Sequence, residues 1–281
     1  MTYQELLRKA EKNIKKVGLE IDVAKFLLMH YANLEIHELY MKLEDEITDE
    51  NIISAFEDGL ALYIDDKVPL QYITGIQLFY GYDFKVDKGV FIPRWETEEL
   101  VERLIIHIDT YYKGESLKIL DLGTGSGCIS ITLAKEIETS KVFASEISEE
   151  AYKIAQNNNE RLNAGVTIQK GSLFDPFENE KFHIIVSNPP YIPDGEEVGI
   201  TVVHEPSVAL YGGVEGLDFY EQIISEAREH ILPGGLIAFE HAYNKNDELR
   251  SIAKKYFPNA IINQYKDASG RDRFTFIEVG D

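Results

Sequence analysis

The chain has 281 residues, of which 44% are hydrophobic and 27% are charged, a composition typical of a folded globular protein with a sizeable core. The formal net charge of −21, from 28 Lys and Arg against 49 Asp and Glu, argues against a duplex nucleic-acid substrate, because phosphate neutralisation requires a basic face. A single cysteine excludes an internal disulfide, no apolar run is long enough for a transmembrane helix, and no spacing of His, Cys and carboxylates predicts a metal site.

The first part of the chain is predicted to be a small helical domain over residues 1–75. Thr2 and Glu5 have the spacing of a capping box, and apolar residues recur after them at helical intervals. Further amphipathic helical patterns follow before residue 68. We interpret this domain as a substrate-recognition module, with simple packing as an equal alternative. Its first residues lack the basic and then apolar pattern of a signal peptide, so we expect a cytoplasmic protein.

A β-hairpin connector is predicted over residues 76–92. The preceding segment, residues 69–75, interrupts the helical pattern, and Gly81 marks the turn between two short strands. The connector ends in an extended stretch, residues 91–94, which leads into acidic residues typical of a helix start. Such a cluster either caps the helix or forms one wall of a ligand pocket.

Residues 93–281 alternate strand and helix patterns, which predicts an α/β domain with a parallel sheet covered on both faces. Strands are expected at residues 117–120, 141–145, 166–169, 182–186, 236–240, 256–262 and 273–279. Helices are expected from about residue 96 to 108, at residues 128–137, from 148 to about 163 and from 217 to about 232. Pro233, Gly234 and Gly235 are expected to form a turn before the next strand. No internal repeat or low-complexity segment interrupts this pattern.

A glycine-rich turn follows the first strand of this domain. Gly123, Gly125 and Gly127 let the backbone approach a ligand closely. Glu146, at the tip of the next strand, suits a ribose diol because a carboxylate can accept from both hydroxyls. The spacing G-x-G-x-G differs from the G-x-G-x-x-G of a dinucleotide site and, with Asp121 able to face an ammonium group, favours S-adenosylmethionine. A tight turn without a ligand and a nicotinamide oxidoreductase are weaker alternatives.

The stretch around which the chain is organised is Asn188, Pro189, Pro190 and Tyr191, directly after a short apolar strand. Each proline restricts itself and the residue before it, so Asn188 and Pro189 are held stiff. The Asn188 side-chain oxygen and the Pro189 carbonyl can together accept both hydrogens of a planar NH2 group, and the Tyr191 ring can wall that spot. The alternative is a diproline turn that only closes the strand.

Taken together, these stretches resemble the HemK/PrmC family of class I methyltransferases, which modify the glutamine of the Gly-Gly-Gln loop in class 1 peptide chain release factors. The resemblance covers nearly the whole chain. Its elements are Pro69–Gly75, Phe91–Arg94 with Glu96–Glu98, Asp121–Gly127, Asn188–Tyr191, Glu205–Pro206 with Ala209–Leu210, Gly216–Leu217 and Arg271–Arg273. The Asn-Pro-Pro-Tyr element also occurs in adenine methylases of nucleic acid, whereas the Ile-Pro-Arg element and the helical N-terminal domain make the match specific.

The resemblance implies a Rossmann-like class I methyltransferase fold with a mostly parallel seven-stranded sheet, preceded by the small helical domain and the hairpin connector. The methyltransferase domain would occupy residues 93–281, with S-adenosylmethionine as its cofactor. Class 1 release factors are the implied protein partners. We expect no direct contact with nucleic acid, no membrane association, no metal and a monomeric protein.

The family pattern also implies roles for individual residues. Together with Asp121, the implied cofactor-binding residues are Gly123, Thr124, Gly125, Ser126, Gly127, Glu146, Ser172, Leu173 and Asn188. The implied substrate-binding residues are Phe91, Arg94, Asn188, Pro189, Pro190 and Tyr191, of which Asn188, Pro189 and Tyr191 are the catalytic ones. In this scheme the glycine turn cradles the methionine part of the cofactor, and Ser172 and Leu173 lie by its adenine.

The sequence departs from the family pattern at four places. Trp95 replaces the usual second proline after Arg94, and Glu146 stands where Asp is more usual. The pair Ser172-Leu173 replaces an Asp followed by an aromatic residue, and Glu240 lacks the usual Ile-Gly after it. These departures concern the ligand-binding edge of the predicted sheet.

An adenine amino-methyltransferase acting on DNA or RNA would use the same asparagine loop on a flipped-out base. The acidic net charge and the lack of a basic, aromatic-rich recognition region argue against it. A non-catalytic scaffold fits less well, because Asn188, Tyr191 and the glycine positions are intact. The predicted mechanism is mainly orientation of a weakly nucleophilic amide nitrogen, which needs no strong general base before transfer.

Overall fold

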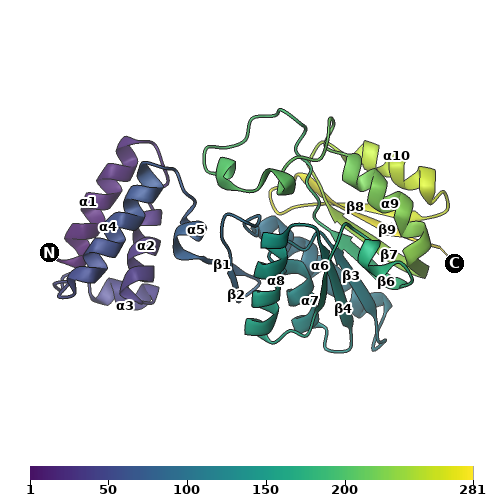
Figure 1. The fold of residues 1–281 in the computed structure, drawn as a ribbon, viewed down its shortest axis with the longest axis horizontal. Helices are drawn as coiled ribbons and strands as arrows, with labels where there is room; N and C mark the ends of the chain where they lie inside the picture. The colour runs from purple at the N-terminus through teal and green to yellow at the C-terminus, as the bar shows by residue number, and fades with distance from the viewer. Residues whose placement is uncertain (281) are drawn as a thin grey trace. The chain divides into compact units, whose positions relative to one another are not determined.

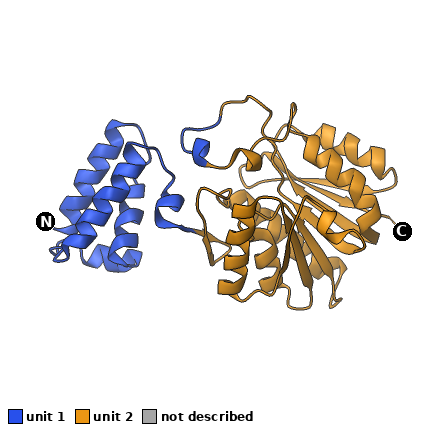
Figure 2. Ribbon diagram, in the orientation of Figure 1, with its two compact units in different colours: residues 1–76, 198–204 blue, residues 77–197, 205–281 orange. Residues whose placement is uncertain are grey.

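The computed structural model describes residues 1–280, which divide into two compact units (Figure 2). The first unit comprises residues 1–76 together with 198–204, and the second comprises residues 77–197 and the described chain from residue 205 onward. The hairpin that we expected as a separate connector therefore lies largely in the second unit. Among the described residues, no helix has both the length and the apolar content needed to cross a membrane.

The first unit is helical, with a core of its own. Its α-helices are α1 (Tyr3–Lys16), α2 (Val23–Ala32), α3 (Ile36–Met41), α4 (Glu50–Ile64) and α5 (Leu70–Thr74), and residues Val202–His204 form a 3-10 turn. The predicted capping box is present, because Glu5 N donates to Thr2 Oγ1 at 3.2 Å and Thr2 N donates to the Glu5 carboxylate at 2.9 Å. Leu6, Leu27 and Phe56 are among the buried side chains that hold α1, α2 and α4 together.

The segment that we expected only to interrupt the helical pattern contains the single-turn helix α5. Pro69 precedes this helix as its N-cap residue, where the missing N–H of proline costs no hydrogen bond. Gly75 ends it with φ of 72°, the left-handed geometry that glycine tolerates best. The turn signals at both ends are therefore boundaries of a very short helix.

The predicted hairpin is confirmed as β1 (Ile76–Phe79) and β2 (Tyr82–Lys85). Its two turn residues, Tyr80 and Gly81, both have positive φ, as a type I′ turn requires. The Asn158 side chain on α8 (Glu149–Leu162) accepts from Lys85 N at 2.8 Å and donates to Lys85 O at 3.0 Å. These bonds fix the hairpin to the helical layer of the second unit.

The second unit is built on a seven-stranded sheet with the strand order β5-β4-β3-β6-β7-β9-β8 (Figure 1). The strands are β3 (Lys118–Leu122), β4 (Lys141–Glu146), β5 (Thr167–Lys170), β6 (Phe182–Ser187), β7 (Ile231–Glu240), β8 (Ile261–Lys266) and β9 (Asp272–Glu278). Strands β3 to β7 are parallel, and β9 is antiparallel to both of its neighbours. This arrangement confirms the predicted Rossmann-like class.

Helices cover both faces of this sheet. One apolar layer joins it to α6 (Trp95–Tyr111), α7 (Cys128–Glu136) and α8, and a second layer joins it to α9 (Asp218–His230) and α10 (Asn246–Tyr256). Short 3-10 turns at Asp175–Phe177 and Ser207–Ala209 complete the regular structure of this unit. Because both faces of the sheet are covered, the strand sequences are continuously apolar instead of alternating between apolar and polar residues.

Two expectations for the C-terminal part are wrong. Residues 233–235, expected in a turn after the helix, lie inside β7, where the pairing with β6 changes register; the helix itself ends at His230, close to the predicted end at about residue 232. Residues 246–256 form α10, and the strand expected at 256–262 begins at Ile261. No side chain caps the start of α10, and the signals that the sequence does carry are Asp247 and Glu248 in its first turn and Lys254 and Lys255 in its last.

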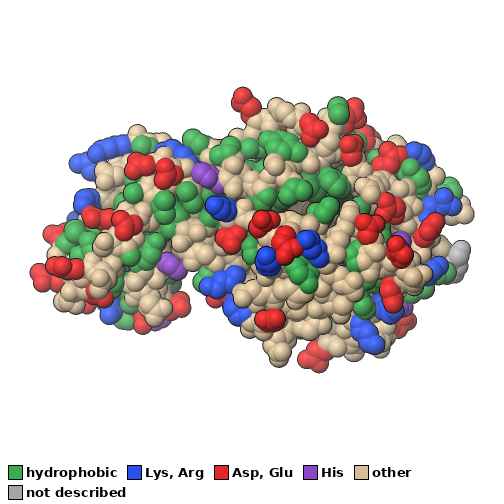
Figure 3. Space-filling view, viewed as in Figure 1, with side chains coloured by type: hydrophobic (Ala, Val, Ile, Leu, Met, Phe, Trp, Pro, Cys, Tyr) green, Lys and Arg blue, Asp and Glu red, His purple; other side chains and the backbone are tan. Residues whose placement is uncertain are grey.

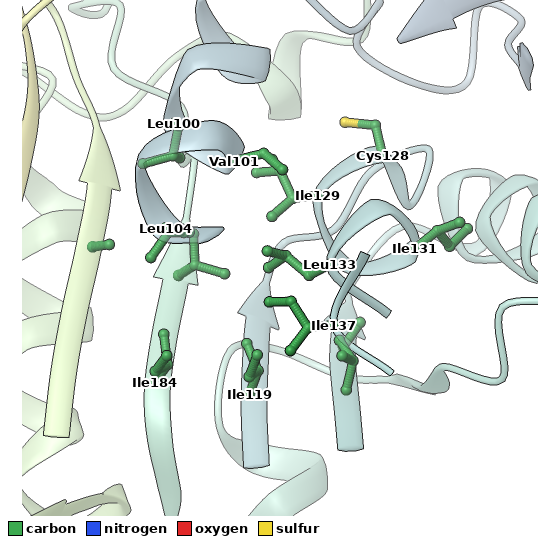
Figure 4. Packing of buried hydrophobic residues seen from close by; sticks show 14 of the residues in the cluster. Leu100, Val101, Leu104, Ile119, Cys128, Ile129, Ile131, Leu133, Ile137 and Ile184 are labelled. Carbon is green, nitrogen blue, oxygen red and sulfur yellow. The ribbon is translucent and has the colours of Figure 1, made fainter. Parts of the chain in front are cut away.

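Figure 4 shows the apolar layer beneath α6 and α7. Leu100, Val101 and Leu104 come from α6, and they pack with Leu133 of α7 and with Ile119 of β3 in one buried cluster. Leu104 has no exposed surface. Because such interiors are packed at the density of organic crystals, removing one of these side chains leaves a cavity that the neighbours fill only partly.

We therefore expect Leu104→Ala to lower the free energy of unfolding by about 2–5 kcal/mol, measured by urea denaturation. Ile106→Ala on the same helix is the matched control, because Ile106 is 58% exposed. Its effect should stay within about 0.5 kcal/mol. Equal losses from the two variants would contradict the assigned burial of α6.

Candidate active site

A pocket opens at the carboxyl edge of the parallel strands. Leu122 ends β3, Glu146 ends β4 and Ser187 ends β6, and all three residues contribute to its wall. The strand order reverses at β3, and open α/β sheets bind their ligands at such a switch point. The pocket therefore lies where the fold class places a ligand site.

The glycine turn after β3 leaves space on its pocket side. Gly123 and Gly125 line the pocket with φ of 69° and 58°, and a Cβ at either position would have no other atom within 4 Å. Gly127 has a different task, because it caps α7 with φ of 84° and its Cβ would lie 2.7 Å from a methyl carbon of Ile131. The first two glycines thus leave room for a ligand, and the third permits the turn itself.

Asp121 lies beneath this turn and is fully buried. Its Oδ2 accepts from the Thr124 hydroxyl at 2.6 Å and from Ser130 N at 3.2 Å, and its Oδ1 has no hydrogen-bond partner within residues 1–280. Burial raises the pKa of Asp121 to about 6. The Asp121 carboxyl group therefore fixes the turn from below rather than forming part of the pocket wall.

Glu146 closes the opposite side of the turn. Its carboxylate accepts from Gly125 N at 2.8 Å and from Ser148 N at 2.9 Å. Burial raises the pKa of Glu146, and these two backbone bonds act in the opposite direction. A carboxylate offers about four acceptor positions, so two remain for hydroxyl groups in the pocket.

Ser172 and Leu173 follow β5 and also line the pocket. Leu173 has φ of 41°, a left-handed conformation that costs a non-glycine residue about 1–3 kcal/mol. The neighbouring Gly171 is in the wall as well, and a Cβ there would lie 2.4 Å from a carbon of Pro176. The backbone of this loop is thus tightly constrained beside the pocket.

Asn188 follows β6 and is connected through Thr97, another residue of the wall, to the buried side chain of Glu240. Its Nδ2 donates to Thr97 Oγ1 at 3.2 Å, and the Thr97 hydroxyl donates to Glu240 Oε2 at 2.7 Å. Asn188 Oδ1 is buried and has no hydrogen-bond partner among the described residues. An unsatisfied buried acceptor is unfavourable, so this oxygen is suited to bind a donor group of a ligand.

The segment after the Asn-Pro-Pro-Tyr loop is anchored by backbone contacts. Ile192 N donates to Leu210 O at 2.9 Å, and Gly212 N donates to Ile192 O at 2.9 Å. A Cβ at Gly212 would lie 2.2 Å from Pro190 O, and one at Gly216 would lie 2.2 Å from the carbonyl oxygen of Tyr191. Only glycines allow this close approach, which fixes the direction of the loop.

The wall formed by Phe91 is held in place by Arg94. The Arg94 guanidinium lies 4.5 Å from the centre of the Phe91 ring, donates to Ile92 O at 2.6 Å and forms an ion pair with Glu205. Glu205 is buried and also accepts from Ile92 N at 3.0 Å. Arg94 is therefore occupied by structural contacts behind the wall.

The structure brings most of the predicted site residues into one pocket. Those in the wall are Phe91, Gly123, Thr124, Gly125, Ser126, Glu146, Ser172, Leu173, Asn188, Pro189, Pro190 and Tyr191. Asp121, Gly127 and Arg94 lie outside the wall and support it.

Burial raises the pKa of Tyr191, so its phenol stays protonated in the neutral range.

The wall also contains residues that sequence reasoning did not select. Thr97 is one, although it belongs to the Glu-Thr-Glu stretch that carried part of the resemblance. Cys128 is another, and burial raises the pKa of its thiol to about 12, which leaves it unreactive. The signal for Thr97 is its contact with Glu240, 143 residues away, which no local pattern reveals.

The residues that line the pocket are suited to bind S-adenosylmethionine next to a primary amide. The open space at Gly123 and Gly125 can receive the chain of an amino acid, and the spare acceptor positions of Glu146 suit a ribose diol. The unpaired Oδ1 of Asn188 suits an N–H donor. The pocket thus offers a nucleoside end and an amide end within one site.

We expect Gly212→Ala to destabilise the protein by about 1–3 kcal/mol in urea denaturation, because the new methyl group would force the backbone away from Pro190. Gly199→Ala is the matched control. A Cβ at Gly199 would only reach ordinary contact, at 3.6 Å from a Val202 methyl group, and neither glycine has positive φ. A Gly212→Ala variant as stable as the control would contradict the close approach.

Comparison with known proteins identifies the family. Residues 82–265 match the methyltransferase small domain, and residues 5–75 match the PrmC N-terminal domain. The chain is 34% identical to a release factor glutamine methyltransferase of Bacillus cereus over 284 aligned residues, which cover 99% of this chain and all of that protein. It is 38% identical to one of Geobacter sulfurreducens, covering 96% of this chain and 93% of that protein.

A solved structure with the same fold is a methyltransferase from Pyrococcus furiosus, with a TM-score of 0.54 and 21% identity, covering 83% of this chain and all of that one. This likeness supports the class I fold that the sheet order already indicates. The two domain matches lie in the order helical unit and then methyltransferase unit, as in the described structure. With relatives above 30% identity along almost its whole length, the chain belongs to the release factor glutamine methyltransferase family.

Proposed function

We propose that this enzyme methylates the side-chain amide nitrogen of the glutamine in the Gly-Gly-Gln loop of class 1 peptide chain release factors, using S-adenosylmethionine. The observation that carries the proposal is the buried, unpaired Oδ1 of Asn188 in the wall of the pocket. A primary amide has two N–H donors, and this oxygen with the Pro189 carbonyl can accept both. The family membership of the whole chain supports the same substrate.

The cofactor would be held by the glycine turn and Glu146. The backbone at Gly123 and Gly125 would follow its methionine part, and Glu146 would accept from its ribose hydroxyls. Ser172 and Leu173 would lie by its adenine. When bound, S-adenosylmethionine supplies an electrophilic methyl group.

The residues of the chain act mainly by orientation. An amide nitrogen is a weak nucleophile because its lone pair is delocalised into the carbonyl group. When Asn188 and Pro189 accept both N–H bonds, the amide nitrogen is held in one orientation toward the methyl group. Such positioning can lower the activation free energy by about 7–11 kcal/mol. The two acceptors also stabilise positive charge that develops on the nitrogen, which afterwards loses one proton to water. Phe91 and Tyr191 would exclude water around the reacting group.

We propose that the first unit recognises the release factor. This role, assigned to residues 1–75, is supported by the match to the PrmC N-terminal domain. Phe26, Tyr40 and Met41 are exposed on this unit by 44%, 58% and 73% and offer apolar surface to a partner. A protein substrate could cover them.

We further propose that the enzyme is a monomer that works in the cytoplasm without binding nucleic acid. Its protein substrate acts in translation, which takes place there. The net charge of −21 opposes binding to phosphates. On the face shown in Figure 3, Lys and Arg side chains are scattered among Asp and Glu side chains rather than gathered in one basic area.

Replacing Glu146 tests the cofactor site. Glu146→Gln should weaken binding of S-adenosylmethionine about 10- to 100-fold in calorimetry, because charged acceptors form hydrogen bonds of about 1.5–3 kcal/mol. Glu138→Gln, an exposed residue, is the control and should bind like the parent protein. Parent-like affinity in Glu146→Gln would remove this residue from the cofactor site.

Replacing Asn188 tests the reaction. Asn188→Ala should lower the rate of methyl transfer to a purified class 1 release factor about 100- to 1000-fold, as expected for loss of one preorganised polar partner. The measurement is the gain of one methyl group by mass spectrometry of the release factor. Asn259→Ala, on an exposed residue, is the control.

The same assay separates the proposed substrate from the alternative. A release factor whose loop glutamine is replaced should gain no methyl group, and neither should DNA or RNA. Methyl transfer to nucleic acid but not to release factor would overturn the proposal. An Asn188→Ala variant as fast as the parent protein would overturn the role of the asparagine.

A further inference from the structure

Two buried side chains linked to Asn188, those of Thr97 and Glu240, have no role in the reaction described so far. Thr97 is in the first turn of α6 and is 1% exposed, and Glu240 is the last residue of β7 and is 2% exposed. Thr97 Oγ1 is 2.7 Å from Glu240 Oε2 and 3.2 Å from Asn188 Nδ2. The hydroxyl group therefore connects the carboxylate to the amide.

The charge of the carboxylate determines the direction of both bonds. An ionised carboxylate can only accept hydrogen bonds, so the single proton of the Thr97 hydroxyl is directed to Glu240. The Thr97 oxygen can then only accept from its other neighbour. Asn188 must present its NH2 group to Thr97, which leaves its oxygen as the group without a partner in the described structure.

We propose that Thr97 and Glu240 are positioning residues that hold the Asn188 amide in the one orientation in which its oxygen is free to accept from the substrate amide. The inference rests on the proposed amide methylation and goes beyond it, because it concerns two residues that do not touch the reacting atoms. In the reverse orientation, the Asn188 NH2 group would face the NH2 group of the substrate, and two donors repel each other.

The surroundings of Glu240 make this arrangement sensitive to pH. Burial raises the pKa of Glu240 to about 7 and Glu96 raises it further, whereas the bond from Thr97, the charge of Arg273 and the Asn188 side chain oppose this rise. The groups that face Glu240 from the elements around it are Glu96 and Thr97 of α6, Cys128 of α7, Asn188 and Tyr191 after β6, Tyr220 of α9 and Arg273 of β9. Once protonated, Glu240 becomes a donor and no longer directs the Thr97 proton.

The first test removes the hydroxyl and keeps the shape. Thr97→Val should lower kcat for methyl transfer about 10- to 100-fold, the usual effect of losing a group that orients a reacting residue. The Kd for S-adenosylmethionine should change less than about twofold, because the hydrogen bonds of the Thr97 hydroxyl go to Glu240 and Asn188 and not to the glycine turn or Glu146. Thr97→Ser restores the hydroxyl and should recover most of the rate.

Thr132→Val is the matched control for the change of packing. Thr132 is fully buried on α7, and its hydroxyl has no partner in the described chain. This variant should keep the parent rate. A Thr97→Val variant with the parent kcat, or a Thr97→Ser variant as slow as Thr97→Val, would overturn the inference.

The second test uses pH. With a pKa of about 7, the ionised fraction of Glu240 falls from about nine tenths at pH 8 to about one tenth at pH 6, so kcat should fall about tenfold over this range. Glu240→Gln cannot ionise, yet its amide oxygen can still accept from Thr97. Its kcat should therefore be nearly constant between pH 6 and 8, and persistence of the same acid limb would contradict the role of Glu240.

The third test needs no methyl acceptor. In protein labelled with 15N-asparagine, the side-chain NH2 signals of Asn188, identified by their loss in Asn188→Asp, should shift with a midpoint near pH 7 and stop shifting in Glu240→Gln. If these signals titrate as expected while release factor gains no methyl group, the proposed function fails and the inference stands. If methyl transfer is normal while the signals do not respond, the inference alone fails.

Discussion

In a parallel sheet neighbouring strands end at the same edge, and the site of this enzyme depends on that constraint. Strands β4, β3, β6 and β7 lie side by side and run parallel, so the groups at their carboxyl ends come together although they are far apart in the sequence. Asp121 and the glycine turn come from β3, Glu146 from β4, Asn188 from β6 and Glu240 from β7. The hydrogen bonds between the strands therefore fix the distances between these positions, whichever side chains occupy them.

Three carboxyl groups at this edge are buried, which is unfavourable unless each one has donors of its own. Thr124 and Ser130 donate to Asp121, two backbone amides donate to Glu146, and Thr97 donates to Glu240. These donors belong to segments that shape the site: the glycine turn, the start of α7, the loop after β4 and the first turn of α6. The hydrogen bonds of these carboxyl groups therefore stabilise the shape of the pocket.

The parts of the site that can be predicted from the sequence are those whose signals come from residues adjacent in the chain. The strand ends, the glycine turn and the stiff asparagine loop all carry local signals, and the structure brings them into one pocket. The hydrogen bond between Thr97 and Glu240 has no such local signal, because it joins the start of a helix to the end of a strand 143 residues further along the chain. The start of α10 has no capping side chain, which weakens its local signal. The Pro-Gly-Gly stretch of β7 favours a turn by composition, but it lies in the strand at an irregularity in the pairing with β6.

The two ends of an asparagine amide have nearly the same size and shape, so packing alone barely distinguishes one orientation from the other. Only the polarity of the neighbours can do so, and a lone hydroxyl is a poor guide because it can donate or accept. A buried carboxylate beyond the hydroxyl removes this ambiguity, since it takes the only proton and forces the hydroxyl oxygen to accept. The hydroxyl and the carboxylate are therefore both needed: the hydroxyl provides the contact with Asn188, and the charge of Glu240 gives that contact its direction.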